Sequence, residues 1–231
     1  MKITENIKML EIPEPKGDFY RPTLTWDDEH LVLFDTGIPG MGALIAEEIK
    51  KAGFKPEDLT DIIITHQDID HIGGALELLK LAPDAKVYGY EVDAPFIEGT
   101  ETPTKLALMQ GKLDSGEIDE TDSFYQMLKT GFAKSHLPVD VKLKDGEVLD
   151  FCGGIETVFT PGHTPGHATF YLQKSKIMVC GDAANIVDGK LVGSNPAMTW
   201  DNEKAEASLE KIKSFDLAGV ICYHTGFLEF K

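Results

Sequence analysis

The segment that decides the fold is Thr65-His66-Gln67-Asp68-Ile69-Asp70-His71, which holds four side chains able to bind metal ions. It begins at the end of residues 61–65, an apolar and β-branched run that predicts a buried strand. His66 and Asp68 are two residues apart, so an extended backbone directs both to the same side. Asp70 and His71 are adjacent, and a turn there would let each reach a different ion. The segment predicts a metal site; a polar turn that only begins a helix is the alternative.

Three more segments carry side chains of the same kind. They are Thr160-Pro161-Gly162-His163-Thr164-Pro165-Gly166-His167, Cys180-Gly181-Asp182 and Tyr223-His224-Thr225-Gly226. The prolines and glycines of the first predict a rigid loop that presents His163. Asp182 and His224 each follow an apolar run. The carboxylate of Asp182 can bridge two cations. Together with residues 65–71, these segments hold five of the seven histidines of the chain.

Around these segments, strands and helices are expected to alternate. Apolar runs predict strands at 30–35, 61–65 and 85–90, and helical spacing predicts helices at 41–52 and 72–81. After Pro138, strands are expected at 139–143, 154–159, 168–173, 176–180 and 217–223, with a helix over 200–215 that Asp201 would cap. The first half of this pattern is typical of an α/β layer.

Residues 94–137 interrupt the alternation with two expected helices, near 103–112 and 121–134. Phe124, Met127, Leu128 and Phe132 have helical spacing, which indicates a helix packed on the core. The alternative is a helical cap over a pocket that supplies apolar substrate contacts. No linker or repeat divides the chain, so we predict one domain over 1–231 with this insertion.

Composition excludes several classes of partner. The chain has 231 residues and a formal net charge of −17, which disfavours nucleic acids and anionic membranes and leaves a small-molecule substrate. No run is long and apolar enough to span a bilayer, and the first six residues do not resemble a secretory signal. Cys152, Cys180 and Cys222 are odd in number and widely spaced, which favours reduced thiols and a cytoplasmic location.

In order along the chain, His66-x-Asp68-x-Asp70-His71, His163, Asp182 and His224 resemble the metallo-β-lactamase superfamily. Asp35-Thr36-Gly37 and the loop 160–167 belong to the same pattern. The resemblance implies an αβ/βα sandwich, in which two mixed sheets lie between helical layers and metals bind at one sheet edge. It also implies the ligands: His66, Asp68 and His163 for one metal, Asp70, His71 and His224 for another, and Asp182 between them. Asp35 and His167 would support the ligands from behind, although Asp35 could instead simply form a turn.

The commonest form of this motif has His where this chain has Asp68. A carboxylate is a harder ligand than imidazole, so zinc, iron and manganese all remain candidates for the one or two divalent ions. The leading hypothesis is hydrolysis of an ester, thioester or lactone by metal-activated water, with Asp70 as the proton shuttle. The alternative is iron-dependent oxidation on the same scaffold, and a metal-binding protein without catalysis is a weaker third.

Overall fold

The computed structural model describes residues 1–14 and 17–230 and contains two large mixed sheets. The first sheet has the order β1 (Lys2–Thr4), β2 (Ile7–Met9), β5 (Thr23–Trp26), β6 (Leu31–Phe34), β7 (Asp61–Ile64), β8 (Lys86–Tyr90) and β9 (Val141–Leu143). The second has the order β10 (Val148–Leu149), β11 (Ile155–Phe159), β12 (Ala168–Leu172), β13 (Ile177–Val179), β16 (Gly219–Cys222) and β17 (Gly226–Glu229). Two small hairpins pair β3 (Ile12–Pro13) with β4 (Phe19–Tyr20) and β14 (Ala184–Val187) with β15 (Lys190–Gly193).

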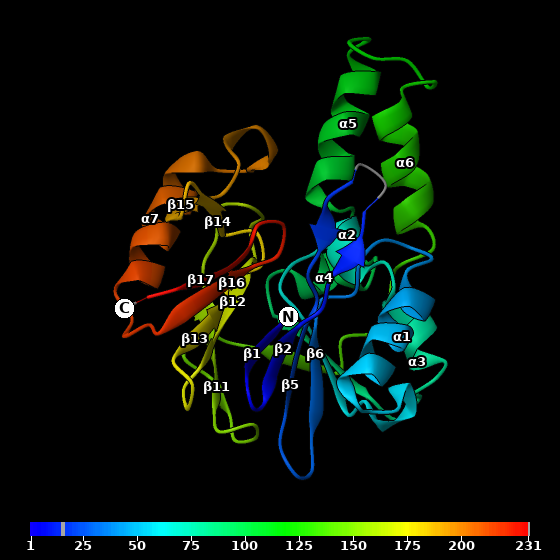
Figure 1. Cartoon of the computed structure of the whole chain (residues 1–231). Coiled ribbons are helices and arrows are strands. Elements are labelled where there is room, and N and C mark those ends of the chain that lie inside the picture. Colours follow the sequence, from blue (N-terminus) through cyan, green and yellow to red (C-terminus); the bar gives the residue numbers. More distant parts are fainter. Residues whose placement is uncertain (15–16, 231) are drawn as a thin grey trace.

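Helices cover the outer faces of both sheets (Figure 1). Those packed on the first sheet or projecting beyond it are α1 (Gly42–Ala52), α2 (Ile69–Ile72), α3 (Ala75–Leu79), α4 (Ala94–Ile97), α5 (Thr104–Asp114) and α6 (Ser123–Phe132). The second sheet is covered by α7 (Asn202–Lys213), and two 3₁₀ turns span Pro56–Asp58 and Pro196–Met198. Asp201 caps α7 as expected, because its side chain accepts a hydrogen bond from the backbone N–H of Lys204.

The core has three apolar layers because the inner strands are buried on both faces. Along β6, Leu33 packs in the cluster under the first helical layer, whereas Val32 and Phe34 pack in the cluster between the sheets. From the other sheet, Phe170 joins the middle cluster, and its ring centroid lies 5.5 Å from that of Phe34. Ile212 of α7 belongs to the third cluster, on the far side of the second sheet. The predicted αβ/βα sandwich is therefore confirmed.

The helix predicted over 72–81 is wrong in its bounds, since the structure has α2 and α3 with Gly73 and Gly74 between them. A Cβ on Gly73 would lie 2.4 Å from Pro39, and one on Gly74 would lie 2.2 Å from the carbonyl oxygen of Thr36. This approach brings the turn after β6 against the metal-binding segment. The strands before residue 30, the β14–β15 hairpin and β17 were not predicted from the sequence.

The expected helices of the 94–137 insertion are α5 and α6, which form a hairpin that projects from the body of the molecule (Figure 1). Leu128 and Phe132 are buried in the first core cluster, whereas Phe124 and Met127 of the same helix are exposed. The hairpin therefore packs one face on the core, as the first interpretation predicts, and leaves another face free. Within the described part of the chain, no helix reaches the length and apolarity needed to cross a membrane.

Candidate metal centre

The predicted ligands lie just beyond the ends of strands in both sheets. Residues 65–68 follow β7, Asp70 and His71 lie in α2, and the loop 160–167 joins β11 to β12. Asp182 follows β13, and His224 follows β16, which is the parallel neighbour of β13. The structure brings all seven side chains to this common edge of the sandwich, although His66 and His224 lie far apart in the sequence.

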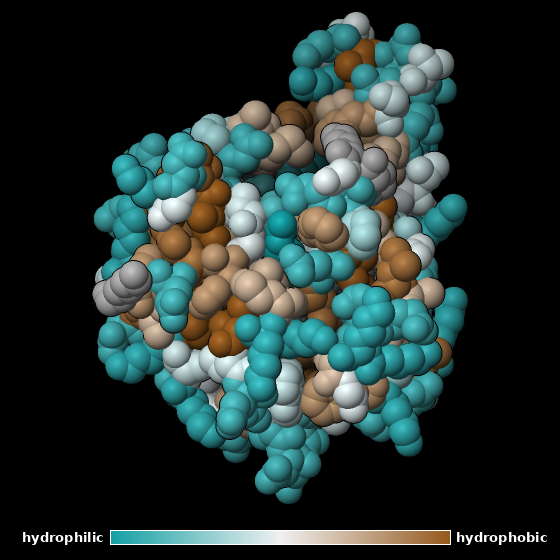
Figure 2. Space-filling view, in the orientation of Figure 1, coloured by the Kyte–Doolittle hydropathy of each residue, from teal (hydrophilic) through white to brown (hydrophobic). Residues whose placement is uncertain are grey.

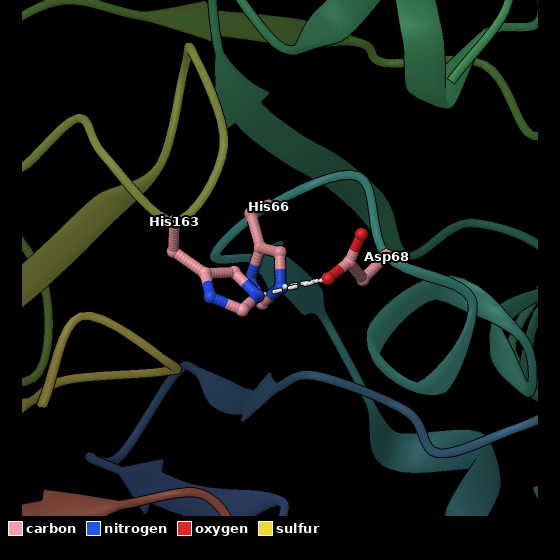
Figure 3. Close-up of side chains that lie close together, drawn as sticks. All are labelled: His66, Asp68 and His163. Carbon is pink, nitrogen blue, oxygen red and sulfur yellow. Dashed lines mark hydrogen bonds and ion pairs between the residues drawn. The ribbon is translucent and has the colours of Figure 1, made fainter. Parts of the chain in front are cut away.

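The first group is His66, Asp68 and His163, whose potential ligand atoms lie within 4.8 Å of one another. Figure 3 shows the Asp68 carboxylate pointing toward both imidazole rings. Its Oδ2 atom lies 2.9 Å from His163 Nε2 and 3.2 Å from His66 Nε2. All three side chains are buried.

The second group is Asp70, His71 and His224, and it lies nearer to solvent. Asp70 Oδ2 is 3.3 Å from His224 Nε2 and 3.7 Å from His71 Nε2. The side chains of His224 and Asp70 are 32% and 22% exposed, whereas His71 is fully buried. The centre is therefore open to solvent on the side of Asp70 and His224.

Asp182 lies between the two groups. One of its oxygens, Oδ1, is 3.4 Å from His71 Nε2. The other, Oδ2, is 3.3 Å from His224 Nε2 and 3.5 Å from His163 Nε2. This carboxylate is therefore placed to contact a cation on either side of it.

All four histidines turn Nε2 toward the centre, and the Nδ1 atoms of three are held from behind. His71 Nδ1 donates to Asp35 Oδ2 at 2.9 Å, His66 Nδ1 lies 2.9 Å from the hydroxyl of Thr65, and His163 Nδ1 lies 2.8 Å from that of Ser194. Such partners set the tautomer of a metal-binding imidazole, because the proton on Nδ1 leaves the lone pair on Nε2 free.

The residues at this centre fit a divalent cation. Among the described residues, the buried side-chain atoms without a hydrogen-bond partner include His66 Nε2, His71 Nε2 and Asp182 Oδ1, and these three side chains form a candidate metal group of their own. Buried polar atoms without partners are costly, and a bound ion would satisfy all three at once. Imidazole nitrogens and carboxylate oxygens are ligands that zinc, iron and manganese accept.

Electrostatics support the same conclusion. Burial alone would lower the pKa of His224, but Asp182 and Asp70 raise it to about 10. Burial would likewise lower the pKa of His71, yet Asp35 and Asp182 raise it well above its ordinary value. The same carboxylates would attract a metal ion, and its binding would displace these protons. At His66, burial and nearby His71 lower the pKa to about 4, so this imidazole is neutral and ready to bind.

Asp35 holds His71 from an uncommon backbone conformation. Its φ angle is 57°, in the left-handed region that Asp and Asn tolerate better than most residues. Its carboxylate accepts hydrogen bonds from the backbone N–H of Thr65 at 2.9 Å and from the Thr65 hydroxyl. Asp35 therefore links the turn after β6 to the start of the metal-binding segment, besides orienting His71.

Replacing Asp35 with asparagine is expected to weaken metal binding by about 10- to 100-fold, as loss of such a partner typically does. Asparagine keeps the side-chain shape and tolerates the left-handed backbone, so the fold should survive. Competition against a chromophoric chelator would measure the affinity. Unchanged affinity would show that Asp35 serves only the turn.

His167 and Tyr223 support the centre without facing it. His167 Nε2 accepts a hydrogen bond of 3.1 Å from the backbone N–H of Asp182, and its Nδ1 lies 3.0 Å from the Thr160 hydroxyl. The Tyr223 hydroxyl donates to the carbonyl of Asp70 at 2.8 Å and accepts from the backbone N–H of Gly37 at 3.0 Å. His167 therefore lies behind Asp182, and its supporting role stays a prediction.

Two residues at the centre were missed in the sequence. Asp93, which precedes α4, accepts four hydrogen bonds from the two loops that carry the first group. Lys105 of α5 places its ammonium against Asp68 and 3.2 Å from His163 Nε2. Neither residue belongs to a motif, so no sequence signal singled it out. Cys180 and Cys222, by contrast, are fully buried in the third core cluster and pack there as apolar side chains.

A family model described as the metallo-beta-lactamase superfamily matches residues 22–224 of the sequence. This chain therefore belongs to the metallo-beta-lactamase superfamily. The probable metallo-hydrolase YflN of Bacillus subtilis (strain 168) is 26% identical over 234 residues, covering 95% of this chain and 80% of that protein. With the cluster of metal-binding side chains, this membership makes the chain a metallo-hydrolase-type enzyme.

Two other similarities are informative. A hydroxyacylglutathione hydrolase of Synechococcus sp. (strain JA-2-3B'a(2-13)) is 29% identical over 177 residues, which cover 76% of this chain. The match spans only about half of that relative, 52% of its length. A crystal structure of a metallo-beta-lactamase family protein from Thermus thermophilus superposes with a TM-score of 0.77 at 24% identity, covering 99% of this chain and 76% of that one. This last similarity shows the shared fold.

Proposed function

We propose that this protein is a hydrolase that uses one or two divalent metal ions to cleave an ester, thioester or lactone of a small molecule. The observation that carries the proposal is the convergence of four Nε2 atoms and three carboxylates beside an apolar cleft. A hydroxyacylglutathione hydrolase, which cleaves a thioester, is among the relatives and supports this bond class. Zinc, iron and manganese each suit the donor set.

The bound cation and Asp70 would have different roles in catalysis. A divalent cation at such a centre supplies an activated water and polarises the substrate carbonyl. Asp70 lies at the open side, where its carboxylate can accept a proton from the attacking water and pass it to the leaving group. Burial raises the pKa of Asp70, but His71 and His224 lower it below its ordinary value, so the carboxylate is ionised and can act as a base.

A cleft of about 220 Å³ lies next to the centre, between α5, the start of α6 and the segment after β15. Its apolar lining includes Leu108, Met109, Phe124, Met198 and Trp200. Lys105 and His163 also line it, so the cleft is continuous with the metal-binding residues. Figure 2 shows apolar surface where the α5–α6 hairpin rises from the body. Larger hollows of about 620 and 630 Å³ exist in the described structure, but none of the seven candidate ligands lines them.

The cleft suits an apolar arm of the substrate. Leu108 is 63% exposed and Trp200 51% exposed, which is unfavourable in water unless a ligand covers them. Lys204 holds the Trp200 ring in place, with Nζ 4.4 Å from the ring centroid. We infer that the cleft receives an apolar acyl or alcohol chain while the carbonyl lies over the metal centre.

The test is a panel of 4-nitrophenyl esters with acyl chains of increasing length, with matched thioesters, lactones and β-lactams. We expect kcat/KM to rise about fourfold per methylene until the cleft is filled, because burying a methylene contributes about 0.8 kcal/mol. Chelation should abolish all activity, and restored divalent metal should recover it.

A matched pair of variants checks the role of the cleft. Leu108→Glu should remove the dependence on chain length, whereas Leu81→Glu, at another exposed leucine outside the cleft, should leave it unchanged. A protein that hydrolyses none of the panel when loaded with metal would contradict the proposed bond class. Equal rates for every chain length would contradict the role of the cleft alone.

A further inference from the structure

Lys105 brings a positive charge into the first ligand group. Its ammonium contacts Asp68 Oδ2 and lies 3.2 Å from His163 Nε2. The side chain is only 17% exposed and reaches the centre from α5, 37 residues after Asp68. The ammonium therefore lies among the atoms that would bind the first of two metal ions.

The charge of Lys105 complements Asp68, the position at which this chain has a carboxylate where the common motif has His. A neutral histidine at position 68 would offer an ammonium no carboxylate, whereas Asp68 offers a buried negative charge that requires a partner. A single oxygen of Asp68, Oδ2, faces His66, His163 and Lys105. An ion entering this group would have to displace the ammonium from that oxygen, since two cations that close repel each other.

The atoms that lack partners are ones that the Lys105 ammonium does not contact. Asp68 Oδ2 and His163 Nε2 both have Lys105 as a neighbour. His71 Nε2 and Asp182 Oδ1 have no hydrogen-bond partner among the described residues, and His66 Nε2 shares this condition. The need for a cation therefore lies among His66, His71 and Asp182, whereas Asp68 and His163 already have the positive charge of Lys105 beside them.

We propose that the Lys105 ammonium takes the place of one of the two metal ions, so that the centre holds a single resident divalent ion. That ion would be held by His66, His71 and Asp182, whose unpartnered atoms it would satisfy, with Asp70 and His224 at the open side. Lys105 and Asp68 then form an ion pair in which each side chain neutralises the buried charge of the other. The inference rests on the proposed metal dependence, but it concerns how many ions bind rather than which bond is cleaved.

The test is a calorimetric titration of chelator-treated protein with zinc. The wild type is expected to bind one equivalent tightly. Lys105→Met removes the ammonium and leaves Asp68 unpaired, so a second equivalent should bind at least about tenfold more tightly than in the wild type, because the incoming ion no longer meets a neighbouring positive charge. Lys112→Met is the control on the same helix, because Lys112 pairs with Glu117 at 3.1 Å and is 38% exposed. It should bind one equivalent.

The double variant Asp68→His with Lys105→Met tests the inference even if Lys105→Met fails to fold, because it removes both charges and leaves neither one unpaired. It should bind two equivalents. Lys105→Arg keeps the positive charge and should still bind one. Two equivalents of similar affinity in the wild type, unchanged by Lys105→Met, would overturn the inference and leave the proposed function standing. A wild-type protein that binds no divalent ion would overturn both.

Discussion

Asp182→Ala is expected to abolish turnover and to lower metal content together. Asp182 is the carboxylate that approaches His71, His163 and His224 at 3.3–3.5 Å, so it joins the two ligand groups. Burial raises its pKa, but His224 and His71 lower it well below the ordinary value, so the side chain is ionised and available to a cation. Without a bound ion, the pKa of water returns from about 7 to 15.7, so the rate should fall by more than about 10³-fold.

Elemental analysis and kinetics on the same preparations would check this prediction. Asp84→Ala is the control, because Asp84 is an exposed aspartate on the loop before β8. It should keep both full metal content and full rate. If Asp182→Ala loses its activity but retains the metal, then Asp182 takes part in catalysis rather than in holding the ion.

Asp93→Ala is expected to give the largest loss of stability. The Asp93 carboxylate is fully buried and accepts hydrogen bonds from Gln67 N at 3.0 Å, Gln67 Nε2 at 2.9 Å, the Thr164 hydroxyl at 2.8 Å and Gly166 N at 2.8 Å. It therefore joins the loop of His66 and Asp68 to the loop of His163. Burial raises its pKa to about 6, against the lowering effect of these bonds, so it is mainly ionised at neutral pH.

Alanine would leave four buried donors without an acceptor. Each costs about 1–3 kcal/mol if water does not replace the lost partner, so we expect a loss of about 4 kcal/mol in the free energy of unfolding. Urea denaturation of chelator-treated protein would measure this loss without a contribution from bound metal. Asp140→Ala is the matched control, since Asp140 is exposed and accepts one hydrogen bond, from Val87 N at 2.8 Å. A cost for Asp93→Ala no greater than for Asp140→Ala would show that the loops do not depend on this carboxylate.

The sequence was sufficient for the positions of the central strands along the chain and for the family. The apolar runs at 31–34 and 61–64 are buried on both faces, which a short continuous run of this kind predicts. The short spacing of His66, Asp68, Asp70 and His71 can be read locally, because it depends on backbone geometry over a few residues. The N-cap at Asp201 is local in the same way. Periodicity cannot give the bounds of α2 and α3. The break between them lies at Gly73 and Gly74, which are glycines because Pro39 and Thr36 approach too closely for a side chain.

Only the tertiary structure decided what surrounds the ligands. Lys105 reaches Asp68 because the α5–α6 hairpin packs one face on the core and turns another toward the cleft. Asp93 meets Thr164 across 71 residues of sequence, and Tyr223 meets Asp70 across 153. Motif spacing and side-chain periodicity depend on only a few neighbouring residues, so they can be recognised in the sequence alone. Contacts between distant segments depend on how whole elements pack, and that packing determines which charge stands beside Asp68.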